Sequence, residues 1–221
     1  LGIDGGDFAE VSAEAVTLRF NTTGALYTGE TIVTGNVSYT FADIPASTSL
    51  QALAISGLRA SVANFVTVGG NFAFEQNGVG AAADVRAVAS DAFAFIQAGD
   101  FRTGIEGGSL ALLINPDTTK VLQASGTFFL EGGDFANVSA TTVTVQLNET
   151  AVDYSAAPLT LDISGIAVDL TAGPNLQSVS VVGLDADFAG VFELSGNFGF
   201  ARDGVFPAGE VRVVASEVDV S

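Results

Sequence analysis

The sequence predicts an all-β fold built from a repeat, and two observations carry that prediction. Long stretches alternate apolar and polar residues with a period of two, which is typical of strands that bury one face. The segment from Gly5 to Asn21, GGDFAEVSAEAVTLRFN, also returns from Gly132 to Asn148 as GGDFANVSATTVTVQLN, with 11 of 17 positions identical. A long fixed period of this kind indicates an array in which neighbouring units bury one another's apolar faces.

The recurring segments set the organisation of the chain. Residues 1–127 form a first copy and residues 128–221 an incomplete second copy, and LEGGDF leads from one to the other without a linker. We therefore expect one continuous body. Two further pairs of segments recur 126 residues apart: GGNFAF at 69–74 with SGNFGF at 195–200, and VRAVAS at 85–90 with VRVVAS at 211–216.

Strands are expected in order along each copy. Val16, Leu18 and Phe20 alternate with polar residues and predict the first of them. Further strands of the first copy are expected near residues 33–41, 53–62, 66–74, 85–95, 110–114 and 122–130. Turns rich in Gly, Asn and Asp separate them, among them one at residues 115–117, so roughly eight to ten short strands are expected per copy. No helix-length window has a 3.6-residue period, which predicts a low helix content.

One of these stretches changes phase in the middle. Leu53 and Ile55 share one phase, and after Gly57 the apolar residues follow the other phase; the second copy repeats the change at Gly183. A one-residue shift at a glycine is typical of a β-bulge or a tight corner, because glycine accepts backbone angles that other residues avoid. Of these two, we expect a corner at both glycines.

The paired phenylalanines of the GNF motifs lie two residues apart and so share one face of a strand. Apolar neighbours on that face favour a core position over a sugar-stacking platform for Phe72, Phe74, Phe198 and Phe200. We expect the replacement of Phe198 by alanine to cost about 3 to 5 kcal/mol if the ring fills the core.

Two architectures fit an all-β repeat of this length. Small residues at inward positions and the absence of a linker favour a β-solenoid or β-helix, in which coils stack in a thin column. Tandem β-sandwich domains are the alternative, since the 126-residue unit has a suitable size for one.

The composition restricts partners and compartment. The formal net charge of −18 repels phosphate backbones and excludes a nucleic-acid-binding role. The chain has no cysteine, so disulfides and thiolate metal sites are excluded. No apolar run approaches the roughly 20 residues of a membrane-spanning helix. A charge of this size suits surroundings rich in salt or divalent ions.

Catalysis is not expected. The absence of histidine excludes triads and general bases that use imidazole, and the absence of cysteine excludes a thiol nucleophile. A carboxylate pair in a groove, as in glycoside-cleaving enzymes, is the remaining option. Only Arg86 and Arg212 correspond between the copies among the basic residues, and a basic residue repeated in each unit points to a structural role.

Two acidic turns are candidates for calcium. Carboxylate and backbone oxygens are the ligands that Ca²⁺ prefers, and the GGD turns place acidic residues on both sides of two glycines. The candidate ligands are Asp4, Asp7, Glu131 and Asp134. No cofactor is required by the sequence, and a solvated acidic turn is the alternative reading of each segment.

The ends of the chain align with the interior of expected strands. Leu1 corresponds to Phe128 and Ser221 to Phe95, so each terminus interrupts an element. Unpaired strand edges are templates for further strands. We therefore expect copies to continue end to end, either in one covalent array or in a non-covalent fibre.

The run VDYSAAPLTLDISG at 152–165, followed by SGNFGF and VRVVAS, resembles the long repeats of giant surface or secreted, adhesin-like proteins of marine bacteria, planctomycetes among them. This resemblance implies an extracellular or cell-surface location and a structural or adhesive role, and it brings no catalytic residues. With the repeat, it predicts a structural segment of a fibre or an adhesin stalk that self-associates. A calcium- or glycan-binding module is the second hypothesis, with a glycan or cell-surface partner, and a polysaccharide-active β-helix enzyme is the third.

Overall fold

The structure is a computed structural model that describes residues 2–4, 6, 9–25, 27–35, 37–40, 50–63, 65–78, 82–204 and 209–221. At residues 3, 4 and 39 it describes the backbone alone. The strands are β1 (Gly2–Asp4), β2 (Ala9–Ser12), β3 (Ala15–Asn21), β4 (Thr31–Thr34), β5 (Val37–Thr40), β6 (Leu50–Val62), β7 (Val66–Asn77), β8 (Asp84–Ala98), β9 (Phe101–Ile114), β10 (Lys120–Gly132), β11 (Asn137–Asn148), β12 (Leu159–Ile163), β13 (Ile166–Leu170), β14 (Leu176–Phe188), β15 (Phe192–Asp203) and β16 (Glu210–Val220).

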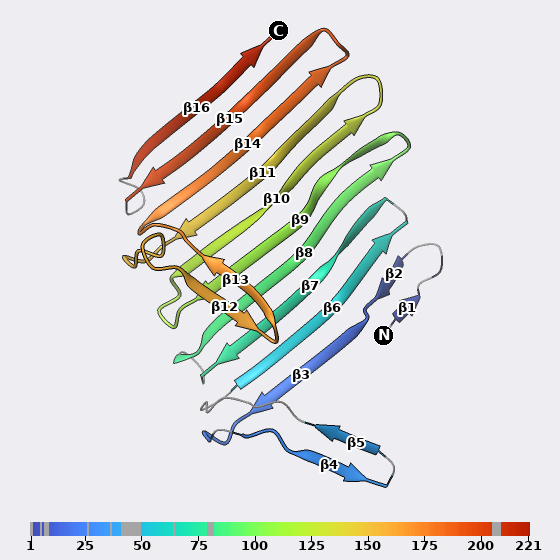
Figure 1. Ribbon diagram of the computed structural model, residues 1–221, viewed down its shortest axis with the longest axis vertical. Helices are drawn as coiled ribbons and strands as arrows, with labels where there is room; N and C mark the ends of the chain where they lie inside the picture. The colour runs from blue at the N-terminus through green and yellow to red at the C-terminus, as the bar shows by residue number, and fades with distance from the viewer. Residues whose placement is uncertain are drawn as a thin grey trace.

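One antiparallel sheet of 12 strands dominates the molecule (Figure 1). Its order is β1-β2-β6-β7-β8-β9-β10-β11-β14-β15-β16, and β3 pairs with β6 beside β2. The first copy passes into the second inside this sheet, because β10 and β11 pair along their length. Two small hairpins, β4-β5 and β12-β13, stand outside it.

The all-β prediction is confirmed. The described strands form an open sheet rather than the stacked coils of a β-solenoid, so the solenoid is not confirmed. Where the chain is described, no helix is long and apolar enough to cross a membrane.

The corners expected at Gly57 and Gly183 are not formed: β6 and β14 each continue through the glycine, which lies in a β-bulge, the other structure that such a phase change indicates. The register shifts between Ile55 and Leu58, and again between Val181 and Leu184. Gly57 has a φ of 59° and Gly183 a φ of 63°, a left-handed conformation that glycine adopts at little cost. Shifts in β7, β8, β10 and β15 lie near the same level, so a line of bulges crosses the sheet.

The asparagine of each GNF motif holds this line of bulges together. Asn71 Oδ1 accepts a hydrogen bond from Gly57 N at 2.9 Å, and Asn71 Nδ2 donates to Asp91 Oδ2 at 3.1 Å. In the second copy Asn197 bonds Gly183 N at 2.8 Å and Glu217 Oε2 at 2.8 Å. The motif therefore recurs because each bulge leaves a backbone donor that an asparagine side chain satisfies.

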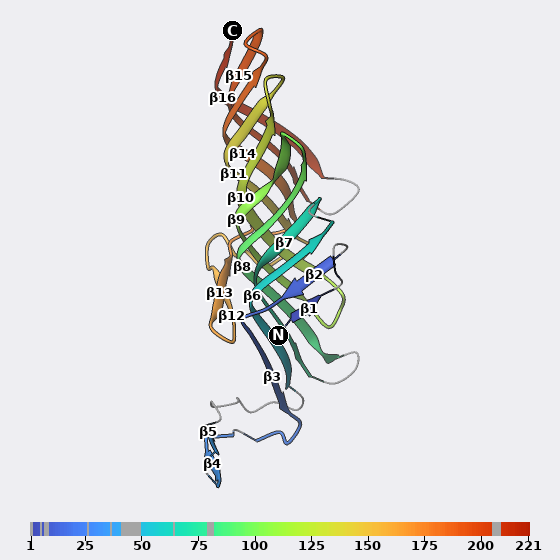
Figure 2. The ribbon, with the colours of Figure 1, turned by 90° about the vertical axis from the view of Figure 1, so that its right-hand side faces the viewer.

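The two faces of the sheet differ in what covers them. The hairpin β12-β13 lies across one face, over β7 to β10 (Figures 1 and 2). Small side chains on that face let the hairpin approach closely. The core between them consists of Ala54, Ala73, Val88, Ala111, Leu113, Val121, Tyr154, Leu161, Ile163 and Leu170.

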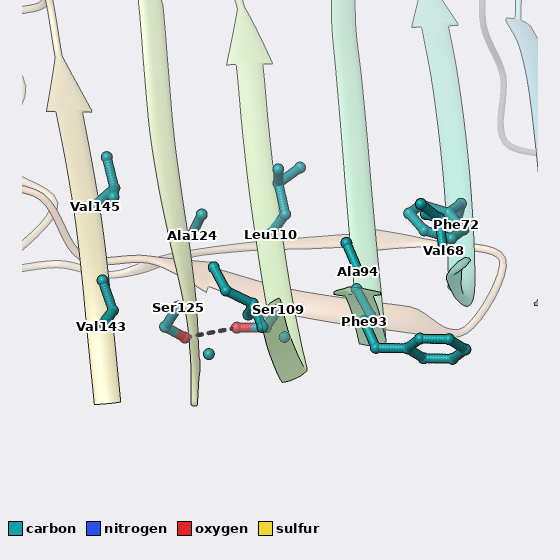
Figure 3. A pocket seen from close by; sticks show the side chains of 14 residues that line it. Val68, Phe72, Phe93, Ala94, Ser109, Leu110, Ala124, Ser125, Val143 and Val145 are labelled. Carbon is teal, nitrogen blue, oxygen red and sulfur yellow. Dashed lines mark hydrogen bonds between the residues drawn. The ribbon is translucent and has the colours of Figure 1, made fainter. Parts of the chain in front are cut away.

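The opposite side of the sheet carries what we call the apolar face. Below the line of bulges it contains two rows of side chains that lie in register across ten strands, from β3 to β16. The first row is Val16, Ile55, Phe72, Ala89, Leu110, Ala124, Val145, Val179, Phe200 and Val213, and the second is Leu18, Leu53, Phe74, Ala87, Leu112, Leu122, Leu147, Gln177, Arg202 and Val211. No described segment of the chain lies over this face as β12-β13 lies over the other one, and part of it is drawn in Figure 3.

The apolar face corrects the expectation for the phenylalanines. Their spacing does place them on one side of each strand, but that side is the apolar face and not the core. Phe74 and Phe200 are about half exposed, and Phe72 and Phe198 are only partly buried. Period two shows which residues share a face; it does not show that a second layer covers that face. The loss of about 3 to 5 kcal/mol expected for a fully buried ring therefore does not apply to Phe198.

Candidate functional site

The two edges of the large sheet are the candidate functional site. At one edge lies β16, which pairs with β15; none of the other described strands pairs with its outer side. At the other edge lies β3, which pairs with β6 alone within the described part of the chain. An edge strand presents backbone donors and acceptors that another strand can use.

The repeat indicates that the outer side of β16 is able to pair with another strand. β16 corresponds to β8 and carries VRVVAS where β8 carries VRAVAS. The far side of β8 is paired with β9 from Val85 opposite Ile114 to Ala98 opposite Phe101. The same backbone side is therefore paired in the first copy, whereas in the second none of the described strands pairs with it.

The two edges also run in opposite directions. Every step of the path from β6 to β16 is antiparallel, so these two strands point the same way, and β3 runs against β6. In Figure 1 the arrows of β3 and β16 point oppositely. An edge of type β3 placed beside β16 would therefore continue the antiparallel order.

Acidic side chains lie along the β16 edge. Glu210, Glu217 and Asp219 are exposed on this strand, and Arg212 pairs with Glu210 at 3.3 Å and with Asp203 at 2.8 Å. The net charge of the chain is −18, so a second copy is repelled at low ionic strength and less so when salt screens the charges.

Arg86 and Arg212, the two basic residues that correspond between the copies, make similar ion pairs. Arg86 Nε lies 2.6 Å from Asp84 Oδ2, and Arg86 Nη1 lies 3.9 Å from Glu75 Oε1. Burial raises the pKa of the Glu75 carboxyl, against the lowering effect of the Arg86 and Arg19 charges. Both arginines thus neutralise carboxylates at the ends of neighbouring strands, which agrees with a structural role.

The candidate calcium ligands fall in different parts of the structure. Asp4 ends β1 with its backbone alone described, and Asp7 lies outside the described residues. Glu131 is exposed at the end of β10, and Asp134 is exposed in the turn that follows. In the described part of the chain, no three acidic side chains gather as a cation site would need.

A basic residue lies beside the second acidic turn. Arg102 Nη1 is 3.9 Å from Glu131 Oε2, and the guanidinium stacks between Phe95 and Phe129 at 4.5 and 4.3 Å from the ring centroids. The rings hold the cation in place by cation–π attraction. A calcium ion at this turn would compete with Arg102 for the Glu131 carboxylate.

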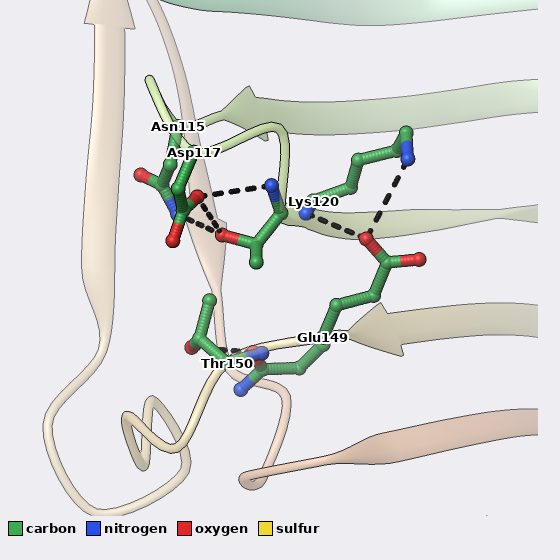
Figure 4. A network of polar contacts seen from close by, with 7 residues as sticks. Asn115, Asp117, Lys120, Glu149 and Thr150 are labelled. Atoms are coloured by element: carbon green, nitrogen blue, oxygen red, sulfur yellow. Dashed lines mark hydrogen bonds and ion pairs between the residues drawn. The ribbon is translucent and has the colours of Figure 1, made fainter. Parts of the chain in front are cut away.

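Polar side chains close the ends of the strands where the two copies meet (Figure 4). Asp117 accepts hydrogen bonds from Thr119 N at 3.0 Å and Thr119 Oγ1 at 2.6 Å, and these bonds hold the pKa of Asp117 below its usual value. Glu149 Oε2 accepts from Lys120 N at 2.9 Å and lies 3.5 Å from Lys120 Nζ. The turn expected at residues 115–117 is thereby confirmed.

Two asparagines in the sequence context of glycosylation acceptors have a structural role instead. Asn148 is buried, accepts from Thr150 N and Oγ1 at 2.9 and 2.7 Å, and donates to Val152 O and Gly173 O at 2.8 and 2.9 Å. Asn21 is also buried and bonds Thr23 in the same way. The N-x-T spacing at these two positions forms a turn at the end of β3 and of β11.

The aromatic rings of the apolar face do not form a stacking row. In register, Phe72 lies between Ile55 and Ala89, and Phe200 lies between Val179 and Val213. Each of these rings therefore has aliphatic neighbours across the strands. A glycan platform needs adjacent exposed rings, and the geometry of these two rows does not supply it.

Comparisons with known proteins assign no function to this chain, so a functional hypothesis has to start from the edges and faces of the sheet. No family model, no curated protein and no solved structure matches this chain.

Proposed function

We propose that this protein is an extracellular structural repeat, a segment of a fibre or adhesin stalk in which copies join by extending one antiparallel sheet. The array grows when an edge strand of one copy pairs with an edge strand of the next. Each unit contacts only the units before and after it in the array, as in other repeat proteins. The solenoid hypothesis requires the same arrangement.

The single observation that carries the proposal is the equivalence of β8 and β16. The two strands share the VRxVAS sequence, yet β8 has a partner on its far side and β16 has none among the described strands. The opposite direction of β3 supports a join with β16, because it keeps every pairing antiparallel without a rearrangement.

Composition supports an extracellular site. The charge of −18 keeps such a segment soluble, and it makes assembly responsive to the salt of an external medium. The resemblance to surface and secreted repeat proteins points the same way.

Electron microscopy and mass measurement of the purified chain test this proposal. We expect particles longer than one 22.4 kDa chain, and we expect their length to increase between about 0.05 and 0.5 M salt as repulsion between acidic edges is screened. Chains that stay at 22.4 kDa under all these conditions would argue against edge-to-edge joining.

Two proline variants provide a matched control for this experiment. Neighbouring residues of an edge strand point their N–H groups to opposite sides, and proline has none. Of Val213→Pro and Val214→Pro, one loses a donor that faces solvent and the other a donor that faces β15. We expect the first to keep its fold by circular dichroism and to lose elongation, and the second to melt at a lower temperature.

A further inference from the structure

The apolar face is the largest feature that edge joining leaves unexplained. Its larger side chains are partly to well exposed, most of all on the edge strands, with Leu18 at 76% and Val213 at 65%, whereas Ala87 and Ala89 in β8 are buried. The face extends from one copy into the other without interruption, since the row that holds Ile55 in β6 also holds Val179 in β14. A contiguous apolar surface of this kind marks an interaction site on a folded protein.

Both copies keep the aromatic positions of this face, although its second row carries Gln177 and Arg202 in the second copy. Phe72 and Phe198 correspond, as do Phe74 and Phe200. By contrast, Arg59 corresponds to Asp185, which reverses the charge. These aromatic residues of the apolar face are thus kept between the copies, whereas the exposed position of Arg59 and Asp185 is not. This is expected if another molecule packs on the apolar face.

The charge distribution restricts which molecule can pack on the apolar face. The chain has 25 acidic residues, and none of them lies in the two rows that cross the ten strands. Two copies can therefore meet at this face without placing carboxylates opposite each other. A like-charged chain could associate at few other places on its surface at so small an electrostatic cost.

The area is sufficient for a stable dimer. With strands about 4.8 Å apart and about 3.4 Å per residue, the whole side of ten strands that average about 12 residues measures roughly 2,000 Å², and the two rows cover about a third of it. A standard protein interface buries about 800 Å² on each partner. Even half of this face, allowing for the twist of the sheet, exceeds that requirement.

The surface is also shaped for packing against a like surface. A groove of about 290 Å³ crosses β7 to β11 and is lined by Phe72, Leu110, Ala124, Val143 and Val145 (Figure 3). The half-exposed rings of Phe74 and Phe200 project from the same side of the sheet. Sheets that pack face to face interdigitate side chains in this manner at a separation of about 10 Å.

We propose that the apolar face is the interface of a homodimer, in which a second copy of this chain packs face to face and completes a β-sandwich. This pairing is independent of edge joining, because it uses side chains of one face and edge joining uses the backbone of β3 and β16. Together the two contacts would give a fibre two sheets thick.

Analytical ultracentrifugation of the unmodified chain at about 0.05 M salt, where we expect edge joining to be weakest, tests the pairing. The parent is expected to sediment as a dimer, twice 22.4 kDa, at about 10 µM. The test variant is Val179→Glu, on the apolar face of β14, where Val179 is 40% exposed. The control is Val182→Glu on the same strand, 48% exposed and in register with Thr142, on the other side of the sheet from Val143.

We expect Val179→Glu to weaken the dimer at least 10-fold and Val182→Glu to leave it unchanged, with circular dichroism spectra that match the parent for both. A parent that stays monomeric up to about 100 µM would overturn the proposal, as would equal weakening by both variants. Flotation of the monomeric parent with phosphatidylcholine vesicles would assign the face to lipid instead. Dimers at about 0.05 M salt together with no elongation up to about 0.5 M salt would refute edge joining and leave this pairing intact.

Discussion

The hairpins β12-β13 and β4-β5 occupy corresponding places in the two copies and differ in what they touch. In β12-β13, Leu161, Ile163 and Leu170 are fully buried against the large sheet. In β4-β5 the described side chains are exposed, Val33 at 66% among them. The hairpin of the second copy packs on strands of the first, β7 to β10, which precede β11 in the sheet.

Position in the sheet accounts for part of this difference. β3, which corresponds to β11, lies at the edge, and beyond it the described chain offers no strands on which β4-β5 could pack. Figure 1 shows β4-β5 outside the sheet, next to β3. Repeat units of an array bury the faces of their neighbours, so the same element is stable in one context and unsupported in another.

Residue pattern accounts for the rest. β12-β13 directs six apolar residues to one side, with Leu159, Ile166 and Val168 joining the three that are fully buried. β4-β5 contains more threonine and serine, and Thr31 Oγ1 bonds Thr40 Oγ1 at 2.7 Å across its strands. The comparison teaches that a hairpin of this repeat needs both an apolar side and a neighbouring unit.

Truncating the docked hairpin should have the largest effect. We expect Leu170→Ala to lower the free energy of unfolding by about 3 to 4 kcal/mol, because it opens a cavity between hairpin and sheet. Val33→Ala, in the undocked hairpin, should change it by less than about 0.5 kcal/mol. Urea denaturation of both variants measures the difference, and similar losses would show that the two hairpins are equally supported.

The next largest difference in stability is expected between variants of Asn148 and Asn21, the asparagines that precede the two hairpins. Asn148 joins the entry of β12-β13 to its exit, through Val152 O before the hairpin and Gly173 O after it. We expect Asn148→Ala to cost about 2 to 3 kcal/mol, since buried carbonyl groups lose their donor. Asn21→Ala lies beside the undocked hairpin and should cost about 1 kcal/mol. The same denaturation assay decides, and a larger loss at Asn21 would reverse the ranking.

The bulge asparagines should behave alike, because their surroundings repeat. Asn71→Ala and Asn197→Ala each leave one bulge donor without its acceptor, so we expect losses of about 1 kcal/mol that agree within about 0.5 kcal/mol. Thermal unfolding followed by circular dichroism checks this expectation. A difference of more than about 1 kcal/mol would mean that the copies are not equivalent at the bulge line.

Calcium should have the smallest effect and stays a prediction. If the acidic turns bind it, millimolar Ca²⁺ raises the melting temperature and EDTA reverses the rise. Asp134→Asn should then abolish the part due to the second turn, and Arg102→Gln, which removes the competing cation, should increase it. No change of melting temperature in any of these proteins leaves only the solvated turn.

Local patterns of the sequence were enough to predict most of the strands and the places where they become irregular. Period two predicted the alternation in β3, β7 and β11, and residues 115–117 predicted a turn. The phase change at Gly57 predicted a corner where the strand has a bulge, and the run near 33–41, expected as one strand, contains the two paired strands β4 and β5. These features depend on neighbours in the chain, through backbone angles and alternating side chains. The candidate edges were also anticipated from the repeat, as unpaired strand ends, although not as a β8-like strand that lacks its β9.

What covers each face was decided by the tertiary structure alone. The alternation at Phe72 and Phe74 shows that one side of β7 is apolar, and the alanines at 54, 73 and 111 show that the other side is small. Sequence reasoning assigned the core to the larger residues, whereas the hairpin β12-β13 packs on the smaller ones. The physical reason is that burial depends on which surface a distant segment reaches, and a hairpin that begins at Leu159, between about 50 and 105 residues after these alanines, approaches closest where side chains are shortest.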